Sequence, residues 1–439
     1  MTRDWIQHWF ARSPTVAPSL FITSALYLVA AVWRRLLFRT TFIAITGSFG
    51  KTTAKECLVQ LLVSQAPTAS TWRNQNNGAG FSASVLRARP WHRFAVIELG
   101  ASHPGSLAHA SRLVRPHIVT ILRVGRAHTG ELGTLEETAN EKAGILEGLL
   151  PGGTVLLNGD DHRVKAIAAR TNRRVHLFGT DSEFAFRADE VSAQWPERLQ
   201  FRFHYGTESI FVQTPYVGEH WLSSVLAALT AARACGLDLN EAGHVLAQGK
   251  PFDARLEPVE LPNGAIILRD EYNALIDTFE AAFEVMQTAR ARRRVVVVSD
   301  YSESTQRQRR RANQLGRETA AVAEAAVFVG EASHRAQRTA IEAGMDPAYT
   351  HSFAGLRDAA VFLKTFLQPE DLVLLKGRAS HHLSRLFFAR FGQVDCWKAT
   401  CSKMMLCDIC PELGPAAQAK HRTKLVAPVW ANDASAVPE

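Results

Sequence analysis

The segment 46–53, TGSFGKTT, has the composition of a loop that binds phosphate groups. Gly47 and Gly50 let the backbone curl so that its N–H groups face phosphate oxygens, and a helix beginning near Lys51 adds its positive N-terminus. Lys51 can reach the β- and γ-phosphates, and the Thr52 hydroxyl can ligate Mg²⁺. The motif is a shortened Walker A loop, because Ile45 stands where the first glycine of GxxxxGK[ST] is expected. Rather than a chance glycine-rich turn, we predict a nucleotide site formed by Thr46, Gly47, Ser48, Gly50, Lys51, Thr52 and Thr53.

Four cysteines near the C-terminus form a second group of side chains that could do chemistry. Cys396, Cys401, Cys407 and Cys410 are separated by four, five and two residues. Four thiolates suit tetrahedral Zn²⁺, which we favour, and Cys410 followed by Pro411 also resembles the end of a ferredoxin-type iron–sulfur motif. The alternative is four reduced thiols without a metal. We expect a structural or docking role for this segment rather than a catalytic one.

The secondary-structure elements that could position the phosphate loop are expected strands and helices in alternating order. Short apolar runs alternate with segments of helical periodicity, which predicts an α/β protein with helices on both faces of a parallel sheet. The runs expected to be strands are 42–45, 95–99, 118–122, 155–157, 265–268, 295–298, 326–329 and 372–375. Residues 180–216 alternate polar and apolar positions, which predicts an antiparallel addition to the first sheet.

Changes in composition divide the chain into four predicted parts. Residues 1–40 form a hydrophobic and basic N-terminal segment, and residues 41–252 a central P-loop ATPase domain. Residues 253–390 form a smaller Rossmann-like α/β domain, and residues 391–439 the cysteine-rich segment with a tail rich in Ala and Pro. We expect that tail to be mobile.

The N-terminal segment contains an uncharged run, 16–33, followed by Arg34, Arg35 and Arg39. Its length is at the lower limit of the ~20 residues that a membrane span needs, and the arginines would place the rest of the chain in the cytoplasm. The alternative is a hydrophobic helix packed on its own domain. We therefore expect a cytoplasmic protein, with association at the inner face of the membrane as an open alternative.

Composition excludes several other classes. The 439 residues are 46% hydrophobic and 21% charged, which is ordinary for globular domains and excludes collagen-like or wholly disordered chains. The net charge of +8 comes partly from the basic runs 290–294 and 307–311, which we interpret as solvated faces. No nucleic-acid motif accompanies them, so we expect no nucleic-acid partner.

Further motifs follow the P-loop in a fixed order. They are NQNNG at 74–78, IELGA at 97–101, RAH at 126–128, NEKAGILEGL at 140–149, GEH at 218–220, DEYNA at 270–274 and DLVLLKG at 371–377. Together with the P-loop, the set resembles the Mur ligase family over roughly residues 41–387. Within the family, ELGAS and DEYNA are most similar to the MurF branch, which adds D-alanyl-D-alanine to a muramoyl tripeptide.

The resemblance implies an ATP- and Mg²⁺-dependent ligase that forms an amide bond. In the family an acceptor carboxylate becomes an acyl phosphate, which the amine of an amino acid or dipeptide attacks, with release of ADP and phosphate. The expected pathway is synthesis of a cell-wall precursor. The implied catalytic residues are Lys51, Glu98, His128 and Lys142, with Thr52, Glu98, His128 and a carbamylated Lys142 as Mg²⁺ ligands. The resemblance also implies nucleotide contacts from His220, Arg255, Asp270 and Asn273, and substrate contacts from Asn76, Asn77 and Lys376.

Several positions depart from the family pattern. Residues 1–40 do not correspond to the family's UDP-binding domain. Ser224 and Arg123 replace asparagines, Leu275 and Ile276 replace Asn-Pro, and Gly144 replaces a glutamate. These changes favour retained ligase chemistry with an altered acceptor. They leave open a poly-γ-glutamate-synthetase-like or specialised-metabolite ligase, or a non-catalytic nucleotide-binding subunit.

Overall fold

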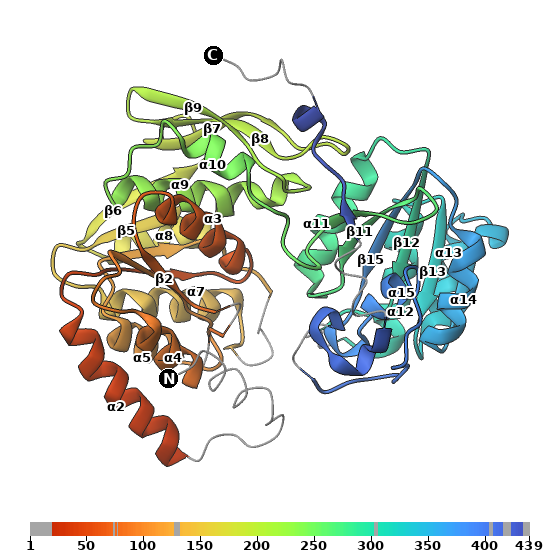
Figure 1. Cartoon of the computed structure of the whole chain (residues 1–439), viewed down its shortest axis with the longest axis horizontal. Helices are drawn as coiled ribbons and strands as arrows, with labels where there is room; N and C mark the ends of the chain where they lie inside the picture. The colour runs from red at the N-terminus through yellow and green to blue at the C-terminus, as the bar shows by residue number, and fades with distance from the viewer. Residues whose placement is uncertain are drawn as a thin grey trace. The chain divides into compact units, whose positions relative to one another are not determined.

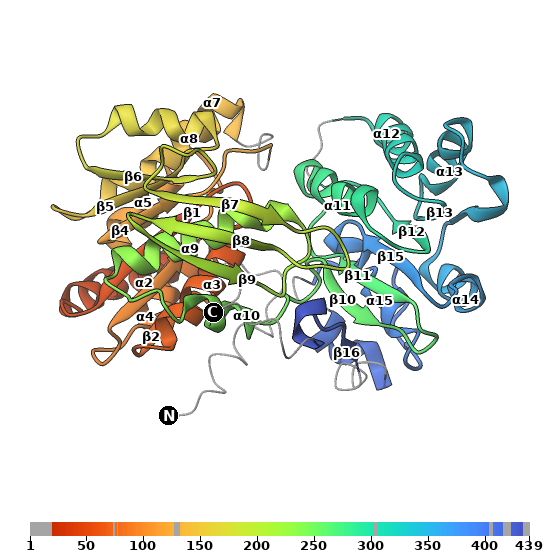
Figure 2. The same cartoon turned by 90° about the horizontal axis from the view of Figure 1, so that it is seen from above.

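The structure is a computed structural model that describes residues 20–72, 75–76, 78–126, 132–302, 306–403, 407–415 and 423–432. The chain divides into two compact units between Phe252 and Asp253 (Figure 1, Figure 2). The first unit begins at Ser24, and the second extends to Val426.

The first unit is built on one nine-stranded sheet with the order β2-β3-β1-β4-β5-β6-β7-β8-β9. The strands from β2 to β7 in this order pair in parallel, whereas β7, β8 and β9 pair antiparallel. The strands are β1 (Thr41–Thr46), β2 (Thr68–Ser70), β3 (Phe94–Glu98), β4 (Ile118–Ile121), β5 (Thr154–Asn158), β6 (Arg174–Gly179), β7 (Phe186–Ser192), β8 (Gln200–Tyr205) and β9 (Glu208–Gln213).

The central strands of this sheet are buried on both sides, because helices cover both of its faces. Ile43 and Ile45 of β1 belong to one core cluster, and Phe42 and Ala44 belong to the other, as the alternation of side chains along a strand requires. The helices are α2 (Leu20–Leu36), α3 (Lys51–Val63), α4 (Ala79–Arg87), α5 (Ser106–Val114), α7 (Leu135–Ala143), α8 (His162–Ile167), α9 (Leu222–Ala234) and α10 (Ala242–Ala247).

The second unit contains a seven-stranded sheet with the order β14-β13-β12-β15-β11-β10-β16. Its strands are β10 (Glu257–Glu260), β11 (Ile266–Asp270), β12 (Arg293–Val298), β13 (Ala325–Val329), β14 (Thr350–Phe353), β15 (Asp371–Lys376) and β16 (Lys424–Leu425). Its helices are α11 (Ile276–Thr288), α12 (Gln308–Ala320), α13 (Ser333–Glu342), α14 (Leu356–Phe366) and α15 (Ser384–Phe388).

This architecture confirms the predicted α/β fold, including the antiparallel addition after β6. The expectation of a mobile tail is wrong for part of the C-terminal segment. Leu413 is 1% exposed, and β16 pairs with β10 at the edge of the second sheet. Val394, Cys407 and Leu413 join the core of the second unit, because burying these side chains removes apolar surface from water.

The N-terminal helix α2 packs against the first unit. Arg34 is 4% exposed, and its guanidinium donates hydrogen bonds to the carbonyls of Val114 (2.5 Å) and Arg115 (2.6 Å). Burial, together with Arg115, lowers the Arg34 pKa to about 10. The Arg34 side chain therefore links α2 to the end of α5, rather than being one of a group of exposed arginines. In the described part of the chain, no helix combines the length and apolarity needed to cross a bilayer.

A buried charge cluster joins three elements of the second unit. The Arg269 guanidinium, 1% exposed, contacts both carboxylate oxygens of Asp408 at 2.9 and 3.0 Å. It also donates to Glu271 (2.9 Å) and Glu257 (3.2 Å). Burial raises the Glu257 pKa to about 7, against the opposing charge of Arg269. The cluster ties the 3₁₀ turn Cys407–Ile409 to strands β10 and β11.

We predict that Arg269→Leu lowers the free energy of unfolding of the second unit by about 3 kcal/mol or more, because it leaves buried carboxylates without their cation. Chemical denaturation of the full chain measures this change. Arg292→Ala is the control, because the Arg292–Glu370 pair is exposed and should contribute less than about 1 kcal/mol. Equal, small losses in the two variants would contradict a stabilising role for the cluster.

Candidate functional site

The P-loop connects β1 to α3 at the carboxyl end of the first sheet. Gly50 precedes the helix with φ 81°, and Lys51 begins it. The Lys51 ammonium lies 2.8 Å from the Gly47 carbonyl, within the curve of the loop. The Thr46 hydroxyl donates to the Leu99 carbonyl at 2.9 Å, which joins the loop to the end of β3. The first turn of α3 therefore presents backbone N–H groups where a phosphate would bind.

Two glycines in the loop are required by close approach. A Cβ on Gly47 would lie 2.9 Å from Leu122 Cβ, and a Cβ on Gly50 would lie 2.4 Å from Ser224 Oγ. The Ser224 hydroxyl also donates to the Gly50 carbonyl at 3.2 Å. Ser48 donates its backbone N–H to the Arg123 carbonyl at 2.8 Å. The loop is thus packed between β4 and α9.

Glu98 is the centre of the polar site at the end of β3. Its Oε1 accepts hydrogen bonds from Thr52 Oγ1 (3.2 Å) and Asn76 Nδ2 (2.6 Å). The residue is 1% exposed, and Oε2 has no hydrogen-bond partner among the described residues. A buried carboxylate oxygen beside the P-loop threonine fits a hard cation such as Mg²⁺.

Lys142 lies near the P-loop lysine. It is 2% exposed on α7, and its pKa is lowered to about 7 by burial and then by the charge of Lys51. A capping box formed by Thr134 and Glu137 starts α7. Glu141 accepts hydrogen bonds from the backbone N–H groups of Gly105 (2.6 Å) and Leu107 (2.8 Å), which fixes α7 against α5. The fold therefore places close to the phosphate loop an amine that loses its proton more readily than an exposed lysine.

Two of the predicted site residues, Asn77 and His128, lie outside the described residues. His220 is described in the 3₁₀ turn Glu219–Trp221, where its ring lies 4.4 Å from the ring of Trp221. The structure therefore brings together Thr52, Asn76 and Glu98 in one hydrogen-bonded group, beside Lys51 and Lys142.

The second unit has its own polar group at the end of β11. Lys376 Nζ lies 2.5 Å from Asp270 Oδ2 and 2.9 Å from the Asn273 carbonyl. Burial raises the Asp270 pKa to about 6, and Lys376 and then Arg255 oppose this shift. Lys376 is fully buried, and burial lowers its pKa against the charge of Asp270. The lysine thus fixes Asp270 and the DEYNA turn.

Arg255 lies between two residues with strained backbone conformations. Its neighbours Ala254 and Leu256 have φ values of 54° and 49°, which non-glycine residues rarely adopt. The Arg255 guanidinium lies 4.7 Å from the centre of the Tyr272 ring. The Leu256 N–H donates to Asp270 at 3.3 Å. Such strain is often found where a side chain must be positioned for function.

Comparison with known proteins identifies a family for both units. Residues 45–232 match the Mur ligase middle domain, and residues 254–379 match the Mur ligase, glutamate ligase domain. The crystal structure of MurF from Acinetobacter baumannii is 30% identical with a TM-score of 0.74, and the match covers 83% of this chain and 79% of that chain. The chain belongs to the Mur ligase family.

Other relatives of this Mur ligase carry related names. The UDP-N-acetylmuramoyl-tripeptide–D-alanyl-D-alanine ligase of Escherichia coli is 31% identical over 277 residues, 62% of this chain. The protein of the same name from Mycobacterium tuberculosis is 28% identical over 366 residues, covering 76% of this chain and 70% of that protein. The match spans 60% of the length of the Escherichia coli relative.

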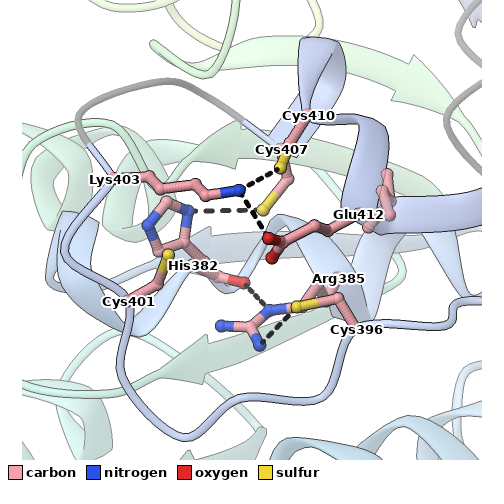
Figure 3. Close-up of a pocket in the computed structure, with 9 residues that line it drawn as sticks. His382, Arg385, Cys396, Cys401, Lys403, Cys407, Cys410 and Glu412 are labelled. Carbon is pink, nitrogen blue, oxygen red and sulfur yellow. Dashed lines mark hydrogen bonds and ion pairs between the residues drawn. The ribbon is translucent and has the colours of Figure 1, made fainter. Parts of the chain in front are cut away.

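The four C-terminal cysteines of this Mur ligase line one pocket (Figure 3). Cys407 Sγ lies 3.3 Å from His382 Nδ1, and Lys403 Nζ lies 3.8 Å from Cys410 Sγ. Arg385 points toward Cys396 Sγ at 4.0 Å. Burial raises the Cys407 pKa to about 12, which favours the neutral thiol. His382 follows the late KG motif, and its position beside these cysteines was not predicted from the sequence.

The expectation of a zinc or iron–sulfur site at these cysteines is not supported. Among the residues that the structure describes, no group of three or more His, Cys, Asp or Glu side chains could hold a metal ion. All four cysteines are free thiols. The fold brings the four thiols into one pocket, but they do not form a ligand set among the described residues.

The altered positions of this Mur ligase are accommodated by packing. The Arg123 guanidinium lies 5.2 Å from the centre of the Phe49 ring, next to the P-loop. Leu275 donates its N–H to Asn273 Oδ1 at 3.1 Å and precedes α11. Gly144 ends α7, where an added Cβ would meet Ala108 at 3.4 Å.

We predict that Gly50→Ala lowers ATP hydrolysis at least about tenfold, because Ser224 must move and the loop with it, and small misplacements are costly. Steady-state ADP release measures the effect. The control is Gly105→Ala, since Gly105 has the same φ of 81° but nothing within 4 Å of the added methyl group. Similar losses in both variants would mean that backbone strain, rather than loop packing, is responsible.

Proposed function

We propose that this chain is an ATP-dependent amide ligase of the MurF type. It joins the carboxylate of a UDP-N-acetylmuramoyl-tripeptide to the amine of D-alanyl-D-alanine, with release of ADP and phosphate, in the synthesis of cell-wall precursors. The observation that carries the proposal is the contact of Thr52 and Asn76 with one oxygen of Glu98, whose other oxygen is unpartnered among the described residues. The names of the relatives support the substrates.

Phosphoryl transfer depends mainly on positioning and on neutralising negative charge. In the proposed reaction the P-loop backbone and Lys51 bind the β- and γ-phosphates. Thr52 and Glu98 would hold Mg²⁺, with His128 and Lys142 as further ligands, and the bound ion would supply charge stabilisation at the phosphate oxygens. The acceptor carboxylate attacks the γ-phosphorus, and the bond to the ADP oxygen breaks. The amine then attacks the acyl carbon, loses a proton and displaces phosphate.

Each unit has its own proposed nucleotide contacts. In the second unit these are Arg255, Asp270 and Asn273, and in the first unit His220 is a further proposed contact. Lys376 is proposed to act through Asp270 and the Asn273 carbonyl, since its ammonium is fully buried. Asn76 and Asn77 remain proposed substrate contacts. Because ATP is the energy source, we place the reaction in the cytoplasm.

We predict that ADP release requires both UDP-N-acetylmuramoyl-tripeptide and D-alanyl-D-alanine, and that Lys51→Ala reduces it at least about hundredfold by removing a positioned cation. Product analysis by chromatography should find ADP and phosphate. Lys165→Ala, an exposed lysine on α8, should retain activity. Formation of AMP and pyrophosphate would exclude the acyl-phosphate route. Turnover with another acceptor alone would retain the ligase chemistry but exclude the muramoyl tripeptide.

We predict that activity falls below pH 7, because protonation of Lys142 removes the neutral amine that reacts with CO₂ to give a carbamate and a proton. The lowered pKa of about 7 sets this range, and the neutral form dominates above it. Added bicarbonate should raise activity near that pH. Lys142→Ala should be inactive and be rescued by a short-chain carboxylate that replaces the carbamate oxygens. Full activity of Lys142→Ala without added carboxylate would overturn this role.

A further inference from the structure

Helix α2 has two different faces, and one of them is bound to the first unit. Ala30 and Leu37 are buried in its core. The Tyr27 ring stacks on His109 with centroids 4.4 Å apart, and the Trp33 indole N–H donates to the Ala88 carbonyl at 2.9 Å. Together with the buried Arg34, these contacts fix the rotation of the helix about its axis.

The opposite face is apolar and exposed. Leu28, Val29, Val32 and Leu36 are 65%, 57%, 61% and 60% exposed, and Phe38, just after the helix, is 80% exposed. Their spacing of three and four residues places the helical members on one side of α2. A contiguous exposed apolar surface of this kind usually marks an interaction site. Figure 1 shows α2 along the outside of the first unit.

Basic and aromatic side chains lie at the C-terminal end of this apolar face. Arg35 and Arg39 are exposed, and residues 24–39 include no acidic residue. The Thr40 hydroxyl donates to the His92 carbonyl at 2.8 Å, which brings the loop 88–93 beside the end of α2. That loop exposes Arg89, Arg93 and Trp91, the last by 69%.

We propose that this surface, which we call the α2 face (Leu28, Val29, Val32, Leu36, Phe38, Arg35, Arg39 and Trp91), binds peripherally to an anionic lipid bilayer. Helices with an apolar side flanked by arginines and tryptophan lie in the headgroup region, where apolar groups reach the acyl chains and arginines contact lipid phosphates. The net charge of +8 favours an anionic surface over a second copy of the chain. This inference is independent of the ligase reaction.

Flotation of the full chain with vesicles tests the proposal. We expect binding to phosphatidylcholine vesicles that contain phosphatidylglycerol, and weaker binding to phosphatidylcholine alone. The double variant Val32→Ser, Leu36→Ser should reduce binding at least about tenfold, since two apolar side chains no longer leave water. Val361→Ser is the matched control, because Val361 is 64% exposed on α14 of the second unit. This variant should bind vesicles like the unaltered chain.

Charge provides a second, separate readout. Arg35→Gln with Arg39→Gln should weaken binding to the anionic vesicles about fivefold per arginine and leave binding to neutral vesicles unchanged. Each variant should retain ATP hydrolysis in solution, which shows that it folds. Absence of vesicle binding at low salt would overturn the proposal. So would equal binding by the Val32, Leu36 variant and its control, or a dimer that only the α2 face variants dissociate.

Discussion

The buried carboxylate of Glu98 is the group on which the arrangement of the first unit's site depends. A charge that is 1% exposed must be satisfied by its surroundings, since desolvation of an unpaired carboxylate is costly. Thr52 supplies one hydrogen bond from the P-loop helix, and Asn76 supplies another from the loop after β2. One oxygen therefore joins three segments, and the other oxygen has no hydrogen-bond partner among the described residues.

The other buried ionisable groups have different surroundings from those of Glu98 and from one another. Lys142 lies within the field of Lys51, so burial and repulsion together favour its neutral form. In the second unit, Lys376 and Asp270 pair directly, and Arg269 is surrounded by three carboxylates. The first arrangement lowers the pKa of an amine, whereas the paired arrangements hold strands and turns in place.

Much of this organisation could be predicted from sequence because it depends on local patterns. The strand–loop–helix order around Lys51 predicts the phosphate site, and the alternation of strands with helices along the chain predicts a parallel sheet covered on both faces. Contacts between distant segments could not be predicted in this way. Arg34 belongs to a basic run in the sequence, yet it is buried because two carbonyls at the end of α5 accept its hydrogen bonds. His382 meets Cys407 because α15 and the 3₁₀ turn fold onto the same core.

The sequence by itself determined the α/β class, the order of the strands along the chain and the residue types available at the phosphate loop, because periodicity and turn chemistry are properties of neighbouring residues. Tertiary structure alone decided which side chains meet: Glu98 with Asn76, Lys142 with Lys51, and Arg269 with Asp408. It also decided that the four thiols share a pocket without forming a ligand set, and that one apolar face of α2 is exposed. Direction and burial of a side chain depend on the packing of whole elements, which spacing along the chain does not specify.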